Sequence, residues 1–214
     1  MKNKKEMENR VHVLKHPLAM DILTQLRDVN TAKGEFKRLV PLAASILFYE
    51  SMISGKMKKV SVETPYATTN SFVLDENFIF VGIMRAGLAL LDGLIHVYPN
   101  APVGHIGIYR DKQMNCTVEY FFRLPRPLEN KTVILTDFAL ASGDTADAAI
   151  SRLKDYKVGP IKLLTLLATE NSIKRMIKKF SDVEIYTLSI EKLDDSNRCI
   201  PGMGDAGERI YGTI

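Results

Sequence analysis

The sequence predicts an α/β fold in which a mainly parallel sheet is covered by helices on both faces. Two observations support this class. From about residue 78 to residue 189, short runs that are almost entirely apolar alternate with segments whose apolar residues recur at helical spacing. Polar or glycine-rich turns follow several of the apolar runs. Strands buried on both faces have this continuous apolar character, and helices connect parallel neighbours. Functional side chains in such sheets gather at the carboxyl ends of the strands.

The N-terminal part is expected to be mostly helical. Residues 1–10 are highly charged and predict an arm, whereas residues 11–214 predict a single domain, which suits a chain of 214 residues. Apolar residues at helical spacing predict helices over 17–27 and 35–53. Residues 60–69 and 71–74 alternate more like a pair of strands, as a hairpin or at a sheet edge.

The remaining elements follow the alternation of strand and helix. The apolar runs predict strands over 78–83, 105–109, 131–136, 161–168 and 183–189. Helical spacing predicts helices over 87–97, from 145 to 154 and over 171–180.

Composition narrows the function classes. Hydrophobic residues make up 46% and charged residues 25%, which is typical of a globular protein, and the net charge is +4. The basic cluster 174–179 is interleaved with apolar residues, which favours the solvated face of an amphipathic helix over a nucleic-acid surface. The charged N-terminus has no apolar segment of the kind found in signal peptides, and no apolar run is long enough to span a bilayer. We therefore expect a cytoplasmic protein with no membrane partner. Cys116 and Cys199 predict neither a disulfide framework nor a protein metal site.

One junction between a strand and a helix carries the strongest chemical signal. An apolar run leads to Asp137, then to the small-residue turn 141–145, and then to a helical pattern. Backbone N–H groups in such a loop converge, and the helix N-terminus adds partial positive charge. Ser142 and Thr145 add hydroxyl donors, so the natural ligand is a phosphate monoester, and Asp137 is placed to accept hydrogen bonds from sugar hydroxyls. For the loop alone, an ordinary strand–turn–helix with a serine cap fits equally well.

Two arginines leave the ends of predicted strands. Arg85 precedes Gly87 at a helix start, and Arg110 closes the next strand. A guanidinium group binds phosphate through two parallel hydrogen bonds, so two of them at neighbouring strand ends indicate a pyrophosphate ligand. Taken singly, either arginine also fits a surface residue bonded to loop carbonyls.

Residues 111–128 break the alternation and look like an extended flap that is aromatic and basic. The flap fits either a β-hairpin packed on the core or a flexible lid that excludes water from a bound substrate.

Near the C-terminus, three glycines lie within six residues in the segment 202–207. Such a loop can wrap its backbone closely around a flat ligand. Asp205 is its only internal acid and is hard to explain by packing. Apolar neighbours such as Met203 and Ile210 argue against a mobile tail.

Taken together, these motifs resemble uracil phosphoribosyltransferases, a group within the type I phosphoribosyltransferases. The likeness runs from about residue 11 to the C-terminus and preserves the order and approximate spacing of the motifs. The matching segments are 83–88, 109–110, 137–145 and 201–207, with further matches at 15–18, 48–50, 91–93 and 120–121. The resemblance implies a parallel sheet flanked by helices, a flexible β flap and a C-terminal base-binding loop.

The resemblance also implies an activity, in which the phosphoribosyl group of phosphoribosyl diphosphate is transferred to uracil to give UMP and pyrophosphate. Arg85, Arg110, Asp137 and Asp205 would be the catalytic residues. Phosphoribosyl diphosphate would be bound by Arg85, Arg110, Asp137, Phe138, Ala139, Leu140, Ala141, Ser142, Gly143, Asp144, Thr145 and Asp205. Uracil would be bound by Cys199, Ile200, Gly204, Asp205 and Ala206. Mg²⁺ would arrive mainly through the diphosphate, and some members of the family respond to GTP.

Several positions depart from the family pattern. Asp144 stands where a glycine is usual and would repel phosphate if it pointed inward, whereas an outward side chain is tolerable. Arg198 stands where a tyrosine is usual, next to Cys199, and residues 169–172 also differ. These departures motivate an alternative, a non-catalytic or altered-specificity relative that acts as a nucleotide-binding regulator.

The predicted helix over 35–53 has a broad apolar surface, including Ile46, Leu47, Phe48, Met52 and Ile53. This surface exceeds what one sheet face needs, so we expect a homodimer or a larger homo-oligomer with two-fold interfaces.

Overall fold

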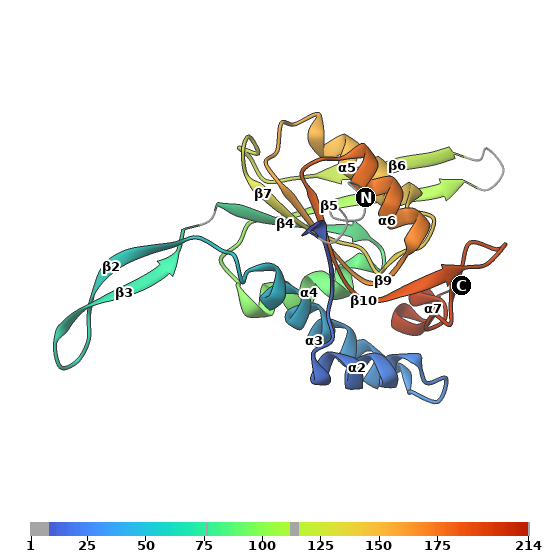
Figure 1. Cartoon of the computed structure of the whole chain (residues 1–214), viewed down its shortest axis with the longest axis horizontal. Coiled ribbons are helices and arrows are strands. Elements are labelled where there is room, and N and C mark those ends of the chain that lie inside the picture. The colour runs from blue at the N-terminus through green and yellow to red at the C-terminus, as the bar shows by residue number, and fades with distance from the viewer. Residues whose placement is uncertain (1–8, 76, 112–115, 214) are drawn as a thin grey trace.

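A mostly parallel sheet forms the centre of the protein in a computed structural model that describes residues 9–75, 77–111 and 116–213 (Figure 1). The main strands lie in the order β1 (Val11–Val13), β10 (Val183–Leu193), β9 (Ile161–Thr169), β7 (Thr132–Thr136), β4 (Phe78–Met84), β5 (Val103–Asp111) and β6 (Cys116–Arg123). Neighbours along this order are parallel, except that β6 runs antiparallel to β5. The predicted α/β class is confirmed.

Helices cover both faces of the sheet, and each face has its own core. One face packs against α2 (Pro17–Arg27), α3 (Lys33–Ser51) and α4 (Gly87–Val97), and the other against α5 (Asp144–Lys154) and α6 (Glu170–Lys179). Strand β4 shows why the strands had to be apolar throughout. Phe78 and Phe80 face the first core, whereas Ile79 and Val81 face the second. Successive side chains of a strand point to opposite faces, so burial of both faces requires a continuous apolar run.

Strand β1 was not predicted from the sequence. Residues 1–10 were predicted to form an arm. Residues 1–8 lie outside the described residues, but Arg10 is firmly attached. Its guanidinium donates to the carbonyl oxygens of Phe180, at 2.6 Å, and Ile177, at 2.9 Å, at the C-terminal end of α6. Strand β1 is short and half-buried, so it lacks the apolar run that marks the other strands.

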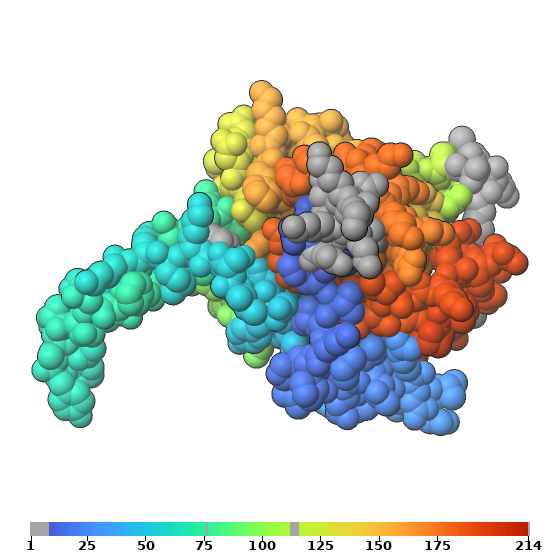
Figure 2. Space-filling view, in the orientation of Figure 1, coloured from blue at the N-terminus to red at the C-terminus, as the bar shows by residue number. Residues whose placement is uncertain are grey.

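Strands β2 (Met57–Glu63) and β3 (Thr68–Leu74) form a hairpin, one of the two expected arrangements, as a separate two-stranded sheet. The predicted bounds are wrong, because the turn at 64–67 lies within the segment 60–69 that was expected to be one strand. The hairpin projects far from the body of the molecule (Figures 1 and 2). Its side chains are mostly exposed, including Phe72 and Tyr66.

Outside the hairpin, the predicted helix and strand positions are confirmed, with shifts at their ends. Strand β10 runs four residues beyond the predicted end at residue 189 and pairs with the short strand β11 (Cys199–Ile200). Another short strand, β8 (Ala139–Leu140), and the helix α7 (Ala206–Tyr211) were not predicted. Within the described residues, no helix has the length and apolar character that a membrane crossing requires.

Candidate active site

The carboxyl ends of three adjacent strands bring the predicted phosphate-binding residues to one edge of the sheet. Strand β4 pairs with both β7 and β5, so Arg85 after β4 lies between Asp137 after β7 and Arg110 near the end of β5. Gly87, the first residue of α4, packs against the end of β7, where a larger residue would not fit. A Cβ atom there would lie 2.5 Å from the carbonyl oxygen of Thr136, whose hydroxyl donates to the Gly87 carbonyl oxygen at 2.9 Å. The two loops are therefore joined at their bases.

The loop 137–145 has the predicted strand–turn–helix geometry, and α6 holds it in place. Gly143, with φ of 83°, is the N-cap residue of α5. The hydroxyl of Thr169 donates to the Ala141 carbonyl oxygen at 2.7 Å, and that of Ser172 donates to the Leu140 carbonyl oxygen at 2.7 Å. Thr169 and Ser172 also form the capping box of α6. Two of the positions that depart from the family pattern therefore fix the middle of this loop.

Asp137 lies at the carboxyl end of β7, where its carboxylate accepts one hydrogen bond, from the Phe138 N–H at 2.8 Å. Burial raises the pKa of Asp137 from 3.8 to about 7, because this bond only partly offsets the loss of solvation. Near neutral pH, Asp137 is therefore poised to exchange a proton or to receive hydrogen-bond donors from a ligand.

The Asp144 carboxylate lies between the basic side chains of Arg110 and Arg175. It forms ion pairs with Arg110 and, at 2.7 Å, with Arg175 of α6, and it accepts a hydrogen bond from the Ser142 hydroxyl at 3.0 Å. Burial raises the pKa of Asp144, but the hydrogen bonds from Arg175 and Ser142 and the charge of Arg110 outweigh it, so the pKa lies below its ordinary value. The carboxylate therefore contacts Arg110 and Ser142, two residues predicted to bind the substrate phosphates, and Arg175 adds a further positive partner.

A cavity of about 570 Å³ adjoins this cluster. It is lined by Arg110, Cys116, Thr117, Asp144, Asp147, Ala148, Ser151, Arg175 and Lys179. The basic residues come from β5 and α6, and the acidic ones from the first turn of α5.

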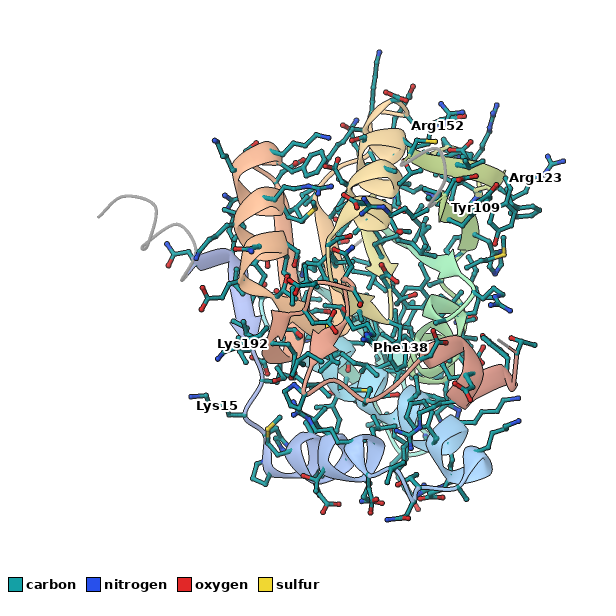
Figure 3. The ribbon with its side chains drawn as sticks, turned by 90° about the vertical axis from the view of Figure 1, so that its right-hand side faces the viewer. Lys15, Tyr109, Arg123, Phe138, Arg152 and Lys192 are labelled. Carbon is teal, nitrogen blue, oxygen red and sulfur yellow. The ribbon has the colours of Figure 1, made fainter. Side chains whose placement is uncertain are left out.

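A larger cavity, of about 750 Å³, lies between the loop after β7 and the C-terminal loop. It contains all five residues predicted to bind uracil, together with three from the phosphate loop. These are Cys199, Ile200, Gly204, Asp205 and Ala206 on one side and Phe138, Ala139 and Ala141 on the other. Figure 3 shows Phe138 at this edge of the sheet, beside the C-terminal segment.

Arg209 anchors the C-terminal loop to the N-terminal helices. Its guanidinium donates to the carbonyl oxygens of Leu26 at 2.5 Å, Met203 at 3.0 Å and Asp28 at 2.7 Å. It also lies 4.1 Å above the centre of the Phe36 ring. On the side of the sheet, the buried Glu191 holds the start of the loop.

The Glu191 carboxylate accepts a hydrogen bond from the Gly202 N–H at 3.1 Å and forms an ion pair with Arg27 at 2.5 Å. Buried carboxylates of this kind need such partners to offset their desolvation. Glu191 therefore positions the loop backbone.

The C-terminal segment also contacts Arg85. Arg85 donates to the hydroxyl of Thr213 at 2.8 Å, and the Tyr211 hydroxyl donates to the Arg85 carbonyl oxygen at 3.0 Å. A Cβ atom on Gly207 would lie 3.2 Å from Asp205 Oδ1 and 3.4 Å from Arg85 Nη2, so Asp205 and Arg85 lie close together. Asp205 also caps α7 by accepting from the Glu208 N–H at 3.0 Å.

The two unusual residues before the C-terminal loop also lie at the larger cavity. Arg198 forms an exposed ion pair with Asp194 at 3.1 Å. Burial and the charges of Glu191 and Asp194 raise the pKa of the Cys199 thiol to about 11. The thiol is therefore neutral at physiological pH and is not an activated nucleophile.

Sequence reasoning did not identify Asp147, Arg175 and Lys179 as part of the site. Residues 174–179 were interpreted only as the solvated face of a helix, and that helix is indeed amphipathic. Arg175 pairs with Asp147 at 3.0 Å, and Lys179 pairs with the same carboxylate. These contacts join residues about 30 positions apart, so no local pattern indicates them.

Comparison with known proteins agrees with this architecture. A family model described as uracil phosphoribosyltransferase matches residues 13–213. The uracil phosphoribosyltransferase of Myxococcus xanthus is 40% identical over 203 residues, which cover 94% of this chain and 96% of that protein. The structure of the AQ2163 protein from Aquifex aeolicus superposes with a TM-score of 0.90 at 31% identity, over 95% of this chain and 98% of that one.

A more distant structure shares the fold alone. A hypoxanthine-guanine phosphoribosyltransferase from Bacillus anthracis has a TM-score of 0.51 at 12% identity, over 74% of this chain and 80% of that one. The resemblance found from the motifs is confirmed over nearly the whole chain. The chain belongs to the uracil phosphoribosyltransferase family.

Proposed function

We propose that this protein is an enzyme that transfers the phosphoribosyl group of phosphoribosyl diphosphate to uracil, forming UMP and releasing pyrophosphate. The observation that carries the proposal is the cavity of about 750 Å³. It joins the loop suited to a sugar phosphate with the glycine-rich loop suited to a flat base. The regulator alternative has no comparable support, because the named relatives are enzymes that match almost the full length of the chain.

In the proposed reaction, N1 of uracil bonds to C1′ of the ribose while the bond from C1′ to the pyrophosphate oxygen breaks. Positive charge develops on the sugar and negative charge on the leaving group. Arg85 and Arg110 neutralise the leaving group from two strand ends, which is electrostatic stabilisation by preorganised charges. The N1 proton passes to water or to the departing pyrophosphate during the transfer.

The loop 137–145 holds the ribose 5-phosphate part of the substrate. Backbone N–H groups at the start of α5 and the hydroxyls of Ser142 and Thr145 bind the 5-phosphate. Asp137 accepts hydrogen bonds from the ribose hydroxyls, in its ionised form. The backbone of residues 199–206 reads the edge of the pyrimidine, and Asp205 lies where the base meets the ribose.

Mg²⁺ is proposed to accompany the diphosphate rather than to occupy a site built by the protein. Among the described residues, no three His, Cys, Asp or Glu side chains gather to hold a metal ion. Mg²⁺ commonly binds through substrate phosphates, waters and one or two carboxylates. Asp205 is the carboxylate that would bind a magnesium-coordinated water, and the ion would add positive charge at the leaving group.

We also propose assembly as a homodimer or larger oligomer, control by GTP and a cytoplasmic location. Two of the apolar residues expected at an interface, Leu47 and Phe48, are instead buried within the protomer. Ile53 remains 76% exposed, and the projecting β2–β3 hairpin offers further surface. Light scattering measures the mass of the assembly, and a repeat with GTP shows whether GTP changes that mass.

The test of function is an assay of pyrophosphate release with each nucleobase in turn. Uracil is expected to support turnover, and efficient use of a purine or orotate in its place would refute the proposed substrate. The variant Asp205→Ala should reduce turnover on the order of 100-fold, the usual effect of losing one transition-state contact. Loss of its cap on α7 costs about 1 kcal/mol. A lower melting temperature with full activity would show that Asp205 is only structural.

A further inference from the structure

The position of Asp144 points to a role that goes beyond tolerance of a carboxylate in a phosphate loop. We propose that Asp144 is an internal competitor of phosphoribosyl diphosphate, which holds Arg110 and Ser142 in the ligand-free enzyme and is displaced from them when the substrate binds. This inference rests on the proposed function, since it concerns the affinity of the same site.

The contacts of Asp144 resemble those that a phosphate oxygen would make. Oδ2 receives hydrogen bonds from the Arg110 guanidinium and, at 3.0 Å, from the Ser142 hydroxyl. Both donors belong to the groups proposed to bind the substrate phosphates. The carboxylate also lies on the first residue of α5, where the helix N-terminus favours negative charge. A substrate phosphate therefore has to take these donors from Asp144.

Arg175 makes this exchange feasible. It donates to the other oxygen of the carboxylate, Oδ1, at 2.7 Å, and also to the Ser142 carbonyl oxygen at 3.3 Å. Two further hydrogen bonds, of 3.2 and 3.0 Å, tie the same guanidinium to Asp147. Arg175 is thus fixed on α6 and keeps its contact with Asp144 after Arg110 has turned to the substrate. The carboxylate then retains a positive partner, so its repulsion of the incoming phosphate is reduced.

The effect on affinity is moderate because the competing pair is partly solvated. The side chain of Asp144 is 24% exposed and that of Arg110 is 37% exposed. Water weakens ion pairs of this kind, so removing the competing charge should tighten binding by about 2- to 5-fold.

The test is calorimetric titration of the full-length protein with phosphoribosyl diphosphate in the presence of MgCl₂. Asp144→Asn keeps the shape of the side chain and removes its charge, so Kd should fall by about 2- to 5-fold. Asp144→Gly should lower Kd as well, and it guards against new hydrogen bonds from the amide. Melting curves check that each variant is folded.

Asp147→Asn is the matched control. Asp147 lies on the same turn of α5 and pairs with Arg175 and Lys179, but no contact joins it to Arg110 or Ser142 among the described interactions. Its replacement should change Kd by less than about 2-fold, since it removes an equal charge without releasing either donor and leaves Arg175 bonded to Asp144 and to the Ser142 carbonyl oxygen. Equal tightening by both asparagine variants would indicate general electrostatics and would overturn the inference.

A double-mutant cycle tests the part played by Arg175. Arg175→Met should weaken binding in the wild-type background, because Asp144 would lose its second partner when Arg110 leaves. The same change should have little effect in the Asp144→Asn background. Equal weakening in both backgrounds would mean that Arg175 contacts the substrate itself, which contradicts the exchange.

The outcomes separate this inference from the proposed function. If the wild-type protein binds phosphoribosyl diphosphate and turns over uracil, but Asp144→Asn and Asp144→Gly bind no more tightly, the inference alone is wrong. If the wild-type protein does not bind phosphoribosyl diphosphate, both fail.

Discussion

Replacing Asp137 with asparagine should stabilise the protein at alkaline pH and leave its stability nearly unchanged in acid. Burial raises the pKa of Asp137 in the folded protein to about 7, compared with 3.8 for an ordinary aspartate. The folded state therefore binds this proton more tightly than the unfolded chain does. Folding stability must then fall as pH rises between these two values.

The size of the effect follows from the difference in pKa. Below pH 3.8 the group is protonated in both states and contributes no penalty, whereas above pH 7 it is ionised in both and the full cost of burying the charge is present. Each pKa unit corresponds to about 1.4 kcal/mol, which gives an upper limit of about 4 kcal/mol. Asp137 retains some contact with solvent, so we expect a gain of about 2 to 3 kcal/mol for Asp137→Asn at pH 8.5.

Urea unfolding at pH 4.5 and pH 8.5 measures this gain. Asparagine is neutral at both values and similar in shape. An ordinary aspartate is already mostly ionised at pH 4.5, so about a quarter of the difference from the wild-type protein should be present there and the full difference at pH 8.5. Asp21→Asn, on an exposed position of α2, serves as the control and should show no such dependence. A difference for Asp137→Asn that is the same at both pH values, or a loss of stability at pH 8.5, would refute the reasoning.

Two further predictions concern the supports of the site. Ser172→Ala should cost about 1 to 3 kcal/mol, because it leaves the Leu140 carbonyl oxygen without the hydroxyl that lies at 2.7 Å, and it should raise KM for phosphoribosyl diphosphate. An unchanged melting temperature would contradict it. Arg209→Met should raise KM for uracil on the order of 10-fold, because the C-terminal loop loses bonds to the carbonyl oxygens of Leu26 and Met203. Steady-state kinetics with each substrate varied should show a smaller change for phosphoribosyl diphosphate, and equal changes would contradict the separate anchoring.

The sequence predicted the main sheet well because its strands are buried on both faces and therefore have continuous apolar runs. Strand β1 was missed, since its three residues are only half-buried and carry no such run. Helix α7 was missed because it is six residues long and begins among glycines. Short elements of this kind are stabilised by tertiary contacts rather than by their own pattern.

The composition of the candidate site was predictable to a similar degree. Residues at the carboxyl ends of strands could be grouped, because parallel strands end at the same edge. The direction of Asp144 could not be predicted, since it depends on Arg175 of a helix 31 residues away in the sequence. The cap that Asp205 provides for α7 could not be predicted either, because the helix itself was not expected.

The close contact between Gly87 and Thr136 divides the site into two mechanical parts. One part comprises the loops after β4 and β7, which are joined at their bases by the hydrogen bond from the Thr136 hydroxyl to the Gly87 carbonyl oxygen. The other is the C-terminal loop, which is fastened to α2 and α3 through Arg209 and meets the first part where Tyr211 and Thr213 contact Arg85. Substitutions in the second part can reshape the nucleobase pocket while the sugar-phosphate machinery keeps its geometry. Such a division gives this architecture a route to new base specificities by small changes in one loop.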